Sequence, residues 1–420
     1  MTHIAVWIVA AVTVLLILIR PKHIPEAACA ISGASILILL RLISPGDALA
    51  AAGRGIDVYL FLTGMMLLAE LARREGFFDW VAVIALENAR GSRKRLFAIV
   101  YAVGTAVTIF LSNDATAVVL TPAVLAVLKK ARAEPMPYLF ICAFIANAAS
   151  FVLPISNPAN LVLYGSNMPP LITWFRSFGL PSLVSIAVTF VVLRFWFAED
   201  LKGTVESDVA RVQLSPAGKR AAYGIAGAGV ALMLASAFNI DLGLPTFLAA
   251  VAAIALVAHK DHGAPLGIVK DISWSILPLV AGLFVLVRAE DQAGALAWTQ
   301  TALNEAAKLG PVTGGLSSAF GVAFLSNIAN NLPVGLIVGS AVRSGAALPA
   351  IRNALLIGVD LGPNPSVTGS LATILWLAAL RRDGEDVSFW KFLRVGLFVM
   401  PPALALSVLT AVLSSKILGN

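Results

Sequence analysis

Long apolar runs, separated by short polar patches, make up most of the chain. The runs that are long enough, or nearly so, to cross a membrane are 4–19, 24–40, 56–72, 138–164, 177–197, 219–238, 244–258, 273–289, 349–380 and 395–415. A transmembrane helix needs about 20 mainly apolar residues. The pattern therefore predicts an all-α polytopic membrane protein with about ten transmembrane spans.

Two pairs of shorter apolar arms lie between these spans. The arms are 96–111 with 115–128, and 311–325 with 328–342. A helical arm of about 14–17 residues reaches roughly 21–25 Å, less than the hydrocarbon core of about 30 Å. We interpret 96–128 and 311–342 as re-entrant hairpins with polar tips inside the membrane; four ordinary short spans are the alternative. Pro122 and Pro333 should disturb the second arms.

Two of the apolar runs exceed one span and contain helix-breaking residues. The breakers are Pro154 and Pro158 in the run 138–164, and Gly362, Pro363 and Pro365 in the run 349–380. A proline removes a backbone donor and clashes with the preceding turn. Each run is therefore predicted to be a broken helix with its gap near mid-membrane, and a kinked helix is the alternative.

The order span, amphipathic segment, hairpin, broken helix, span occurs twice, at 56–197 and 273–415. The two copies have opposite orientation, which is the inverted-topology repeat of many secondary transporters. Residues 1–55 contribute N-terminal spans, 219–272 connecting spans, and 198–218 a polar cytoplasmic linker. We predict a transporter rather than an enzyme, with no cofactor.

Composition and charge agree with a membrane protein and fix its orientation. The chain is 59% hydrophobic and 13% charged, with mean hydropathy +0.89 and net charge +7. Lys and Arg gather on one side of the predicted topology, at Arg20, Lys22, Arg73, Arg74, Arg90–Arg95, Lys129–Arg132, Lys202–Arg220, Lys260, Lys270 and Arg381–Arg394. This side should be cytoplasmic, which places both termini outside. The positive charge does not indicate a nucleic-acid partner; the expected surroundings are lipid.

Polar residues at the hairpin tips and helix breaks are the candidate substrate site. Polar, helix-breaking patches at membrane depth persist only where they are buried or line a cavity, and matching patches in two halves indicate a transporter's binding site. The candidates are Ser112, Asn113, Thr116, Asn157, Asn160, Ser326, Asn327, Asn330, Asn331, Asn364 and Thr368. A single Asn of this kind is more often a hydrogen-bonding link between helices; the clustering favours a site.

Several motifs give a family resemblance over nearly the whole chain. They are Arg74-Glu-Gly-Phe-Phe-Asp-Trp80, Ser112-Asn-Asp with Leu120-Thr-Pro122, Phe324-Leu-Ser with Asn330-Asn-Leu-Pro333, and Gly358-Val-Asp-Leu-Gly-Pro363 with Gly369-Ser-Leu-Ala-Thr-Ile-Leu-Trp376. The chain resembles the arsenical pump membrane protein (ArsB) family of the ion transporter superfamily. The resemblance implies efflux of arsenite and antimonite across the inner membrane in exchange for protons. Some relatives pair with a soluble arsenite-stimulated ATPase.

The chemistry of arsenous acid suits amides and hydroxyls, because at neutral pH it is largely an uncharged trihydroxide. Asn, Ser and Thr offer both donors and acceptors. Cys29 and Cys142 are too few for a three-thiolate site. Ser-Asn motifs at hairpin tips and helix breaks would also suit sodium sites. The alternative function is therefore a sodium-coupled anion symporter of the dicarboxylate or sulfate kind.

Proton coupling requires a titratable group within the membrane. Asp114, at the first hairpin tip, is the leading candidate, and Asp360, before the second break, is the runner-up. A charged carboxylate at that depth costs several kcal/mol. Asp114 could instead cap the helix that follows it. The second half is predicted to carry Ile328 at the position that matches Asp114, and Glu70 should face the interior of its span.

Overall fold

The computed structural model describes residues 2–19, 24–206, 213–258, 264–345 and 348–418. Within these ranges the regular structure is helical apart from one isolated bridge between Ser92 and Thr204. This confirms the all-α class. Lys260 and the other basic residues at 20, 22 and 211 lie outside the described residues.

The predicted apolar runs all form helices. The first part contains α1 Thr2–Ile19, α2 Glu26–Leu39, α3 Pro45–Gly53, α4 Ile56–Arg74, α5 Phe77–Ala89, α6 Arg93–Phe110, α7 Asn113–Ala115, the π-helix η2 Thr116–Leu120, α8 Thr121–Lys130, α9 Met136–Ala148, η3 Pro154–Ser156, α10 Pro158–Tyr164, η4 Gly165–Asn167 and α11 Leu171–Trp196. The remainder contains α12 Pro216–Ala237, α13 Gly243–Ala258, α14 Ala264–Asp271, α15 Ile276–Gln292, α16 Ala295–Lys308, α17 Gly310–Ala329, α18 Asn331–Arg343, α19 Pro349–Leu361, η5 Val367–Gly369, α20 Leu371–Arg382 and α21 Phe389–Leu418.

By length and composition, four described helices could each cross a membrane: α11, α12, α17 and α21. The bent pair α3 and α4, with an angle of 46°, would be a fifth. The other apolar helices are shorter or interrupted. These observations support a multi-pass membrane protein.

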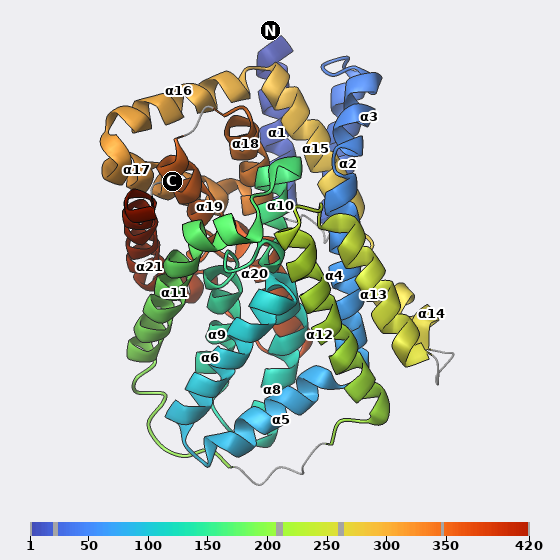
Figure 1. The fold of residues 1–420 in the computed structure, drawn as a ribbon, viewed down its shortest axis with the longest axis vertical. Helices are drawn as coiled ribbons and strands as arrows, with labels where there is room; N and C mark the ends of the chain where they lie inside the picture. Colours follow the sequence, from blue (N-terminus) through green and yellow to red (C-terminus); the bar gives the residue numbers. More distant parts are fainter. Residues whose placement is uncertain (1, 20–23, 207–212, 259–263, 346–347, 419–420) are drawn as a thin grey trace.

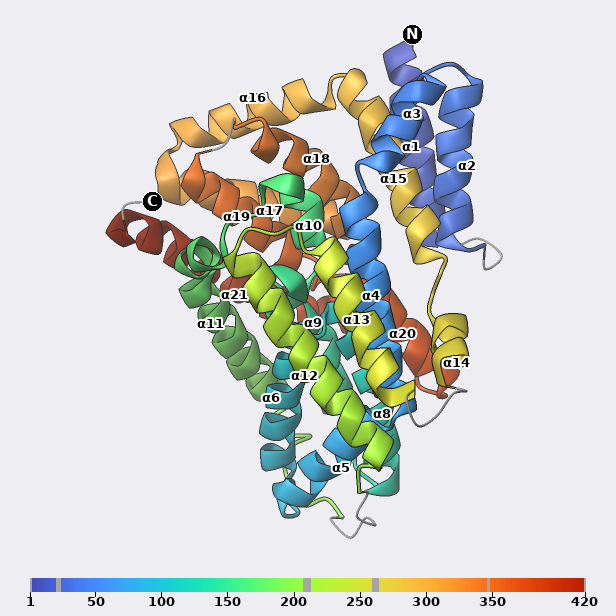
Figure 2. The ribbon, with the colours of Figure 1, turned by 45° about the vertical axis from the view of Figure 1, so that its right-hand side comes forward.

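The helices are arranged between two ends that each carry a transverse helix. Helix α5 lies across one end of the molecule and α16 across the other, and the N-terminus lies at the α16 end (Figures 1 and 2). Helices α6 and α8 lie in the half near α5, whereas α17 and α18 lie in the half near α16. The two hairpin pairs therefore enter the molecule from opposite ends.

Helix α9 forms the centre of the packing. All its residues from Pro137 to Ala148 are buried, as expected for a helix that is apolar on every side. Phe140 packs against Trp376 and Phe392 with ring centroids 5.9 and 5.8 Å away. The Trp376 indole donates to the Leu139 carbonyl at 3.0 Å. Helices α9, α20 and α21 are thus fixed to one another beside the breaks.

The linker begins as a segment attached to the turn between α5 and α6. The Arg93 guanidinium donates to the carbonyls of Thr204 at 3.1 Å and Asp200 at 3.2 Å. The Val205 amide donates to the Gly91 carbonyl at 2.9 Å. Residues 207–212 of the linker lie outside the described part of the chain.

The arms of the hairpin pairs differ from the sequence prediction in two ways. Helix α17 continues to Ala329, so it is longer than the predicted arm; Asn327 lies within it, and its Nδ2 donates to the Ala323 carbonyl. Pro333 does not disturb α18, because it lies in the first turn, where a missing N–H costs little. Pro122 follows the π-helical turn η2, and π-turns are common at functional sites.

Close packing of α17 on α19 generates a stability prediction. A Cβ added at Gly358 would lie 2.7 Å from the Ala319 carbonyl oxygen. We expect Gly358→Ala to destabilise the fold by about 1–3 kcal/mol, as overpacking does. Thermal unfolding of the detergent-purified protein measures this. Gly321→Ala is the matched control, because nothing lies within 4 Å of its added Cβ; equal unfolding midpoints for the two variants would contradict the packing argument.

Candidate functional site

The two hairpin tips have the same local structure. Ser112 and Asn330 both have positive φ, 152° and 68°, and both cap the arm that follows. Ser112 Oγ accepts from the Ala115 amide and Asn330 Oδ1 from the Leu332 amide, each at 3.2 Å. A side-chain oxygen at this position satisfies a free N–H of the first turn. The second arms therefore begin at Asn113 and at Asn331.

This register corrects two expectations about Asp114. The capping residue is Ser112, so Asp114 is not the cap. Its counterpart in the second hairpin is Leu332, because each follows the first residue of its arm. Ile328 lies four residues earlier, on α17, and is 52% exposed. Among the described residues, no hydrogen bond to the Asp114 side chain is found.

The two helix breaks also match. Nine residues separate Ala148, at the end of α9, from Pro158, and nine separate Leu361, at the end of α19, from Leu371. Each break contains a short 3-10 turn. Asn157 caps α10 by accepting from the Ala159 amide at 3.0 Å. In the second break the Thr373 amide donates to Ser370 Oγ at 3.2 Å.

Ser370, and not Asn364, therefore occupies the position equivalent to Asn157. The sequence pairing rested on the shared Asn-Pro dipeptide, but only the first of these dipeptides starts a helix. Asn364 instead follows α19 closely, within the turn that begins the second break. The two Asn-Pro dipeptides have different structural roles.

Two hydrogen bonds join the breaks to one another. Asn157 Nδ2 donates to Asp360 Oδ1, and Asn147 Nδ2 donates to Asn364 Oδ1, each at 2.8 Å. All four side chains are buried. Sequence reasoning missed Asn147; its signal was a lone amide in a very apolar run, one residue before the helix end, as Asp360 is in α19.

Three of the four polar patches line one small central cavity, and the start of α20, directly after the second break, adds apolar residues to it. It is lined by Asn113, Asp114, Asn157, Pro158, Asn331, Leu332, Leu371 and Ala372, with Val58, Leu62, Val162, Ile276 and Val280 as apolar walls. Its volume of about 10 Å³ is close to the minimum for one water molecule. None of the described residues that line it is Lys or Arg. The site presents three amides and one carboxyl.

The other predicted Asn residues bind backbone carbonyls. Asn160 Nδ2 donates to Ser150, Leu153 and Pro154 at 2.9, 3.3 and 3.2 Å. Asn327 Nδ2 also reaches the Gly362 carbonyl at 2.7 Å, and Asn330 Nδ2 the Thr368 carbonyl at 3.1 Å. These contacts hold the first break together and attach the second tip to the second break.

The predicted hydroxyl residues lie near the tips and breaks but outside the central cavity lining. Thr116 Oγ1 lies 2.8 Å from Thr108 Oγ1, and Thr368 Oγ1 donates to Ser366 Oγ at 3.4 Å. Ser326 is buried, and its hydroxyl has no partner among the described residues. Ser112 lines a neighbouring cavity.

Cavities flank the central one towards both ends of the molecule. One of about 90 Å³ shares Asp114 and Pro158 with it and extends to Glu70, near the α5 end. Another of about 350 Å³ shares Val58 and Val162 and extends to Arg343, near the α16 end. The polar groups of the central cavity therefore lie between one cavity towards the α5 end and another towards the α16 end.

A helical membrane fold with a polar cavity between paired helix breaks defines a membrane transporter. Residues 13–358 match the citrate transporter (CitMHS) family, and the chain belongs to this family.

Individual relatives agree with this class and confirm the resemblance seen in the motifs. The arsenical pump membrane protein of Escherichia coli K12 is 27% identical over 414 residues, which cover 93% of this chain and 94% of that protein. The one from Yersinia enterocolitica is 29% identical over 354 residues, with 81% and 82% covered. The crystal structure of the Alcanivorax borkumensis YdaH transporter covers 89% of this chain and 87% of its own, with TM-score 0.54 and 16% identity, and supports the fold alone.

The bond between the breaks generates a prediction that separates the two intramembrane aspartates. Asp360→Asn retains an oxygen that can accept from Asn157, so we expect it to fold and remain active. Asp360→Ala leaves the Asn157 amide unpaired and should cost about 1–3 kcal/mol. Thermal unfolding and transport by both variants measure this. Loss of transport in well-folded Asp360→Asn would give Asp360 a protonation role instead.

Proposed function

We propose that this protein exports trivalent metalloids, arsenite and antimonite, from the cytoplasm in exchange for protons. The observation that carries the proposal is the central cavity, where both hairpin tips and the first break bring together Asn113, Asn157, Asn331 and Asp114. The similarity to proteins named arsenical pump membrane proteins supports the substrate class. Their names indicate transport rather than an enzymatic reaction.

The proposed architecture is two inverted repeats, with about ten spans, two re-entrant hairpins and two broken helices. The matching tip caps and the two nine-residue breaks support an internal repeat. The opposite positions of α5 and α16 support its inversion (Figures 1 and 2). Basic residues such as Arg93 and Lys129 lie at the α5 end, which would be cytoplasmic under the positive-inside rule. This orientation puts the N-terminus outside the inner membrane.

A neutral trihydroxide would match the polar groups of the cavity. Each Asn amide can donate to one oxygen and accept from another hydroxyl, and no fixed positive charge is needed. The cavity is too small for such a substrate in this conformation, so the tips and breaks must separate to admit it. Alternating access, in which the repeats move against each other, would provide this separation.

Asp114 is the proposed carrier of the coupling proton. Its carboxyl lines the central cavity and the cavity towards the α5 end. Since it is neither the helix cap nor hydrogen-bonded within the described residues, it can exchange its proton without breaking the tip. It would take a proton from outside and release it to the cytoplasm as substrate moves the other way. Asp360, bound to Asn157, would be structural.

The direct test is arsenite uptake by everted membrane vesicles with an inside-acid pH gradient and no sodium. In this geometry export appears as uptake, and we expect a protonophore to abolish accumulation. Asp114→Asn should lose at least about 10²-fold of proton-driven uptake, comparable to the loss of a positioned proton-transfer group. Asp200→Asn, an exposed linker carboxylate, is the matched control and should transport normally. Full coupling in Asp114→Asn would remove this residue from the mechanism.

A sodium-coupled anion carrier is the second candidate, because the family match is to citrate transporters. A citrate or dicarboxylate anion would need positive charge at its site, and the described lining of the central cavity offers a carboxyl instead. The same vesicles distinguish the two functions. Sodium-dependent citrate transport, together with no arsenite uptake under the proton gradient, would replace the metalloid proposal.

The cavity also predicts that transport does not depend on thiols. Cys29 and Cys142 are buried in α2 and α9, and neither lines the central cavity. We expect the double substitution Cys29→Ser with Cys142→Ser to retain arsenite uptake within about twofold, since each is a small change at a buried site. If uptake is lost while the protein remains folded, thiol ligation of the metalloid must be reconsidered. The soluble ATPase expected from the resemblance stays a prediction.

A further inference from the structure

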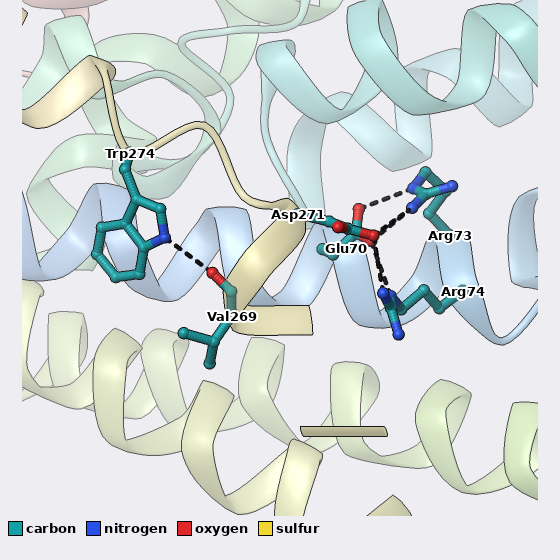
Figure 3. Close-up of polar contacts among 6 residues, drawn as sticks. All are labelled: Glu70, Arg73, Arg74, Val269, Asp271 and Trp274. Atoms are coloured by element: carbon teal, nitrogen blue, oxygen red, sulfur yellow. Dashed lines mark hydrogen bonds and ion pairs between the residues drawn. The ribbon is translucent and has the colours of Figure 1, made fainter. Parts of the chain in front are cut away.

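An ion-pair cluster closes the α5-end cavity on the side away from Asp114. We define the cluster as Glu70, Arg73, Arg74 and Asp271 (Figure 3). Arg73 donates to both Glu70 oxygens, through Nε at 2.7 Å and Nη2 at 2.6 Å. Arg74 donates through Nε to Glu70 Oε1 at 3.1 Å and through Nη2 to Asp271 Oδ2 at 2.7 Å. The cluster thus joins the end of α4 to the end of α14.

The position of Asp271 is set by the segment that follows it. In the turn between α14 and α15 the Trp274 indole donates to the Val269 carbonyl at 2.8 Å (Figure 3). The bond from Arg74 holds the pKa of Asp271 below its usual range. Asp271 therefore remains a charged partner across the range of physiological pH.

The cluster lies between the α5-end cavity and solvent. Ser112 and Asp114 line the cavity from the hairpin tip, and Glu70 and Asp271 line it from α4 and α14. Its volume of about 90 Å³ would hold roughly three water molecules at about 30 Å³ each. The Asp271 side chain is 45% exposed, whereas that of Glu70 is 10% exposed. A short aqueous path from Asp114 would therefore end at these two carboxylates.

We propose that this cluster is the cytoplasmic port for the coupling proton, and that its charge balance sets the pH at which Asp114 releases that proton. The inference rests on the proposed proton exchange at Asp114. It assigns positioning roles to Glu70, Arg73, Arg74 and Asp271, none of which touches the central cavity.

The charge of the cluster acts on the Asp114 carboxyl across the shared cavity. In the intact cluster the two negative charges of the carboxylates and the two positive charges of the guanidiniums cancel. Removing one charge leaves an excess unit charge at the wall of the cavity that Asp114 shares, where water screens it less than at an open surface. Excess positive charge favours the deprotonated Asp114, and excess negative charge favours the protonated form.

Other charged groups near Asp114 stay constant in this comparison. Asp360 lies behind Asn157. A neighbouring cavity that shares Val118 and Val119 with the α5-end cavity is lined by the charged residues Arg73, Asp79, Lys129, Arg382 and Asp383. Only the first of these belongs to the cluster.

Glu70 is not itself the proton carrier in this proposal. Three hydrogen bonds from two arginines occupy its oxygens. The proton leaves the Asp114 carboxyl, passes to water in the α5-end cavity and reaches the cytoplasm beside Asp271. Each transfer leaves the cluster in its starting charge state.

The test measures arsenite uptake by everted vesicles as a function of external pH, which is the pH at the cytoplasmic face. Uptake should rise with pH as Asp114 loses its proton. Glu70→Gln should move the midpoint to lower pH and Arg73→Gln to higher pH, each by about half a unit to one unit, for a unit charge at an effective dielectric constant of about 20. The double variant, Glu70→Gln with Arg73→Gln, restores the charge balance and should have the wild-type midpoint.

The matched control is Glu305→Gln, which removes a carboxylate from the exposed pair with Lys308 on α16, at the other end of the molecule. Its midpoint should equal that of wild type. A merely structural role for the cluster would lower transport in all cluster variants without shifts of opposite sign. The double variant keeps the test decisive where a single variant folds poorly, since it restores neutrality.

The outcomes separate this inference from the proposed function. Suppose that wild type shows Asp114-dependent, proton-driven uptake and that wild type, Glu70→Gln and Arg73→Gln have the same pH midpoint. The port is then wrong, and the exchange function stands. If Asp114→Asn retains proton coupling, Asp114 is removed from the mechanism and the port is wrong, whereas proton exchange by another group stands. Opposite shifts in the two single variants, with restoration in the double variant, support the port.

Discussion

The structure depends on one constraint: backbone groups freed by a helix break inside a membrane must find partners within the protein. Each half of this chain contains a nine-residue break and a hairpin tip. Asparagine amides supply many of the partners, since Asn160 binds three carbonyls in the first break and Asn327 reaches Gly362 in the second. The bond between Asn157 and Asp360 then joins the two breaks. Without these contacts the polar segments could not remain at this depth.

The same constraint decides which polar residues can serve a substrate. An amide nitrogen that already donates to two or more carbonyls has no free N–H for a ligand, so Asn160 and Asn327 are better understood as parts of the frame. Asn113 and Asn331 follow the capping residues and face the central cavity with Asp114. At each tip, therefore, one residue caps the helix and the next residue faces the cavity. A smaller site results than the number of intramembrane asparagines suggests.

The sequence was sufficient to predict the helices on either side of the two polar tips and the interruptions at 149–157 and 362–370, because hydrophobic length and proline position determine these features locally. The sequence could not determine how the polar motifs of the second half align with those of the first. Ser326-Asn327 matches Ser112-Asn113 in letters, yet it remains helical in α17, and the cap is Asn330. Capping depends on where the chain turns, which is set by packing between segments distant in sequence. For the same reason Asn147, whose partner Asn364 is far along the chain, escaped notice.

The two tips share local backbone geometry but differ in chemistry, and this difference bears on energetics. Leu332 stands where the first half has Asp114, so the described lining of the central cavity contains one carboxyl. Under the proposed function, one proton would enter for each neutral trihydroxide that leaves, and each cycle would move one positive charge inward. A membrane potential of about 100 mV then contributes about 2.3 kcal/mol, more than the roughly 1.4 kcal/mol of one pH unit. Under that exchange, a single acidic tip would make the membrane potential the larger part of the driving force whenever the pH gradient is small.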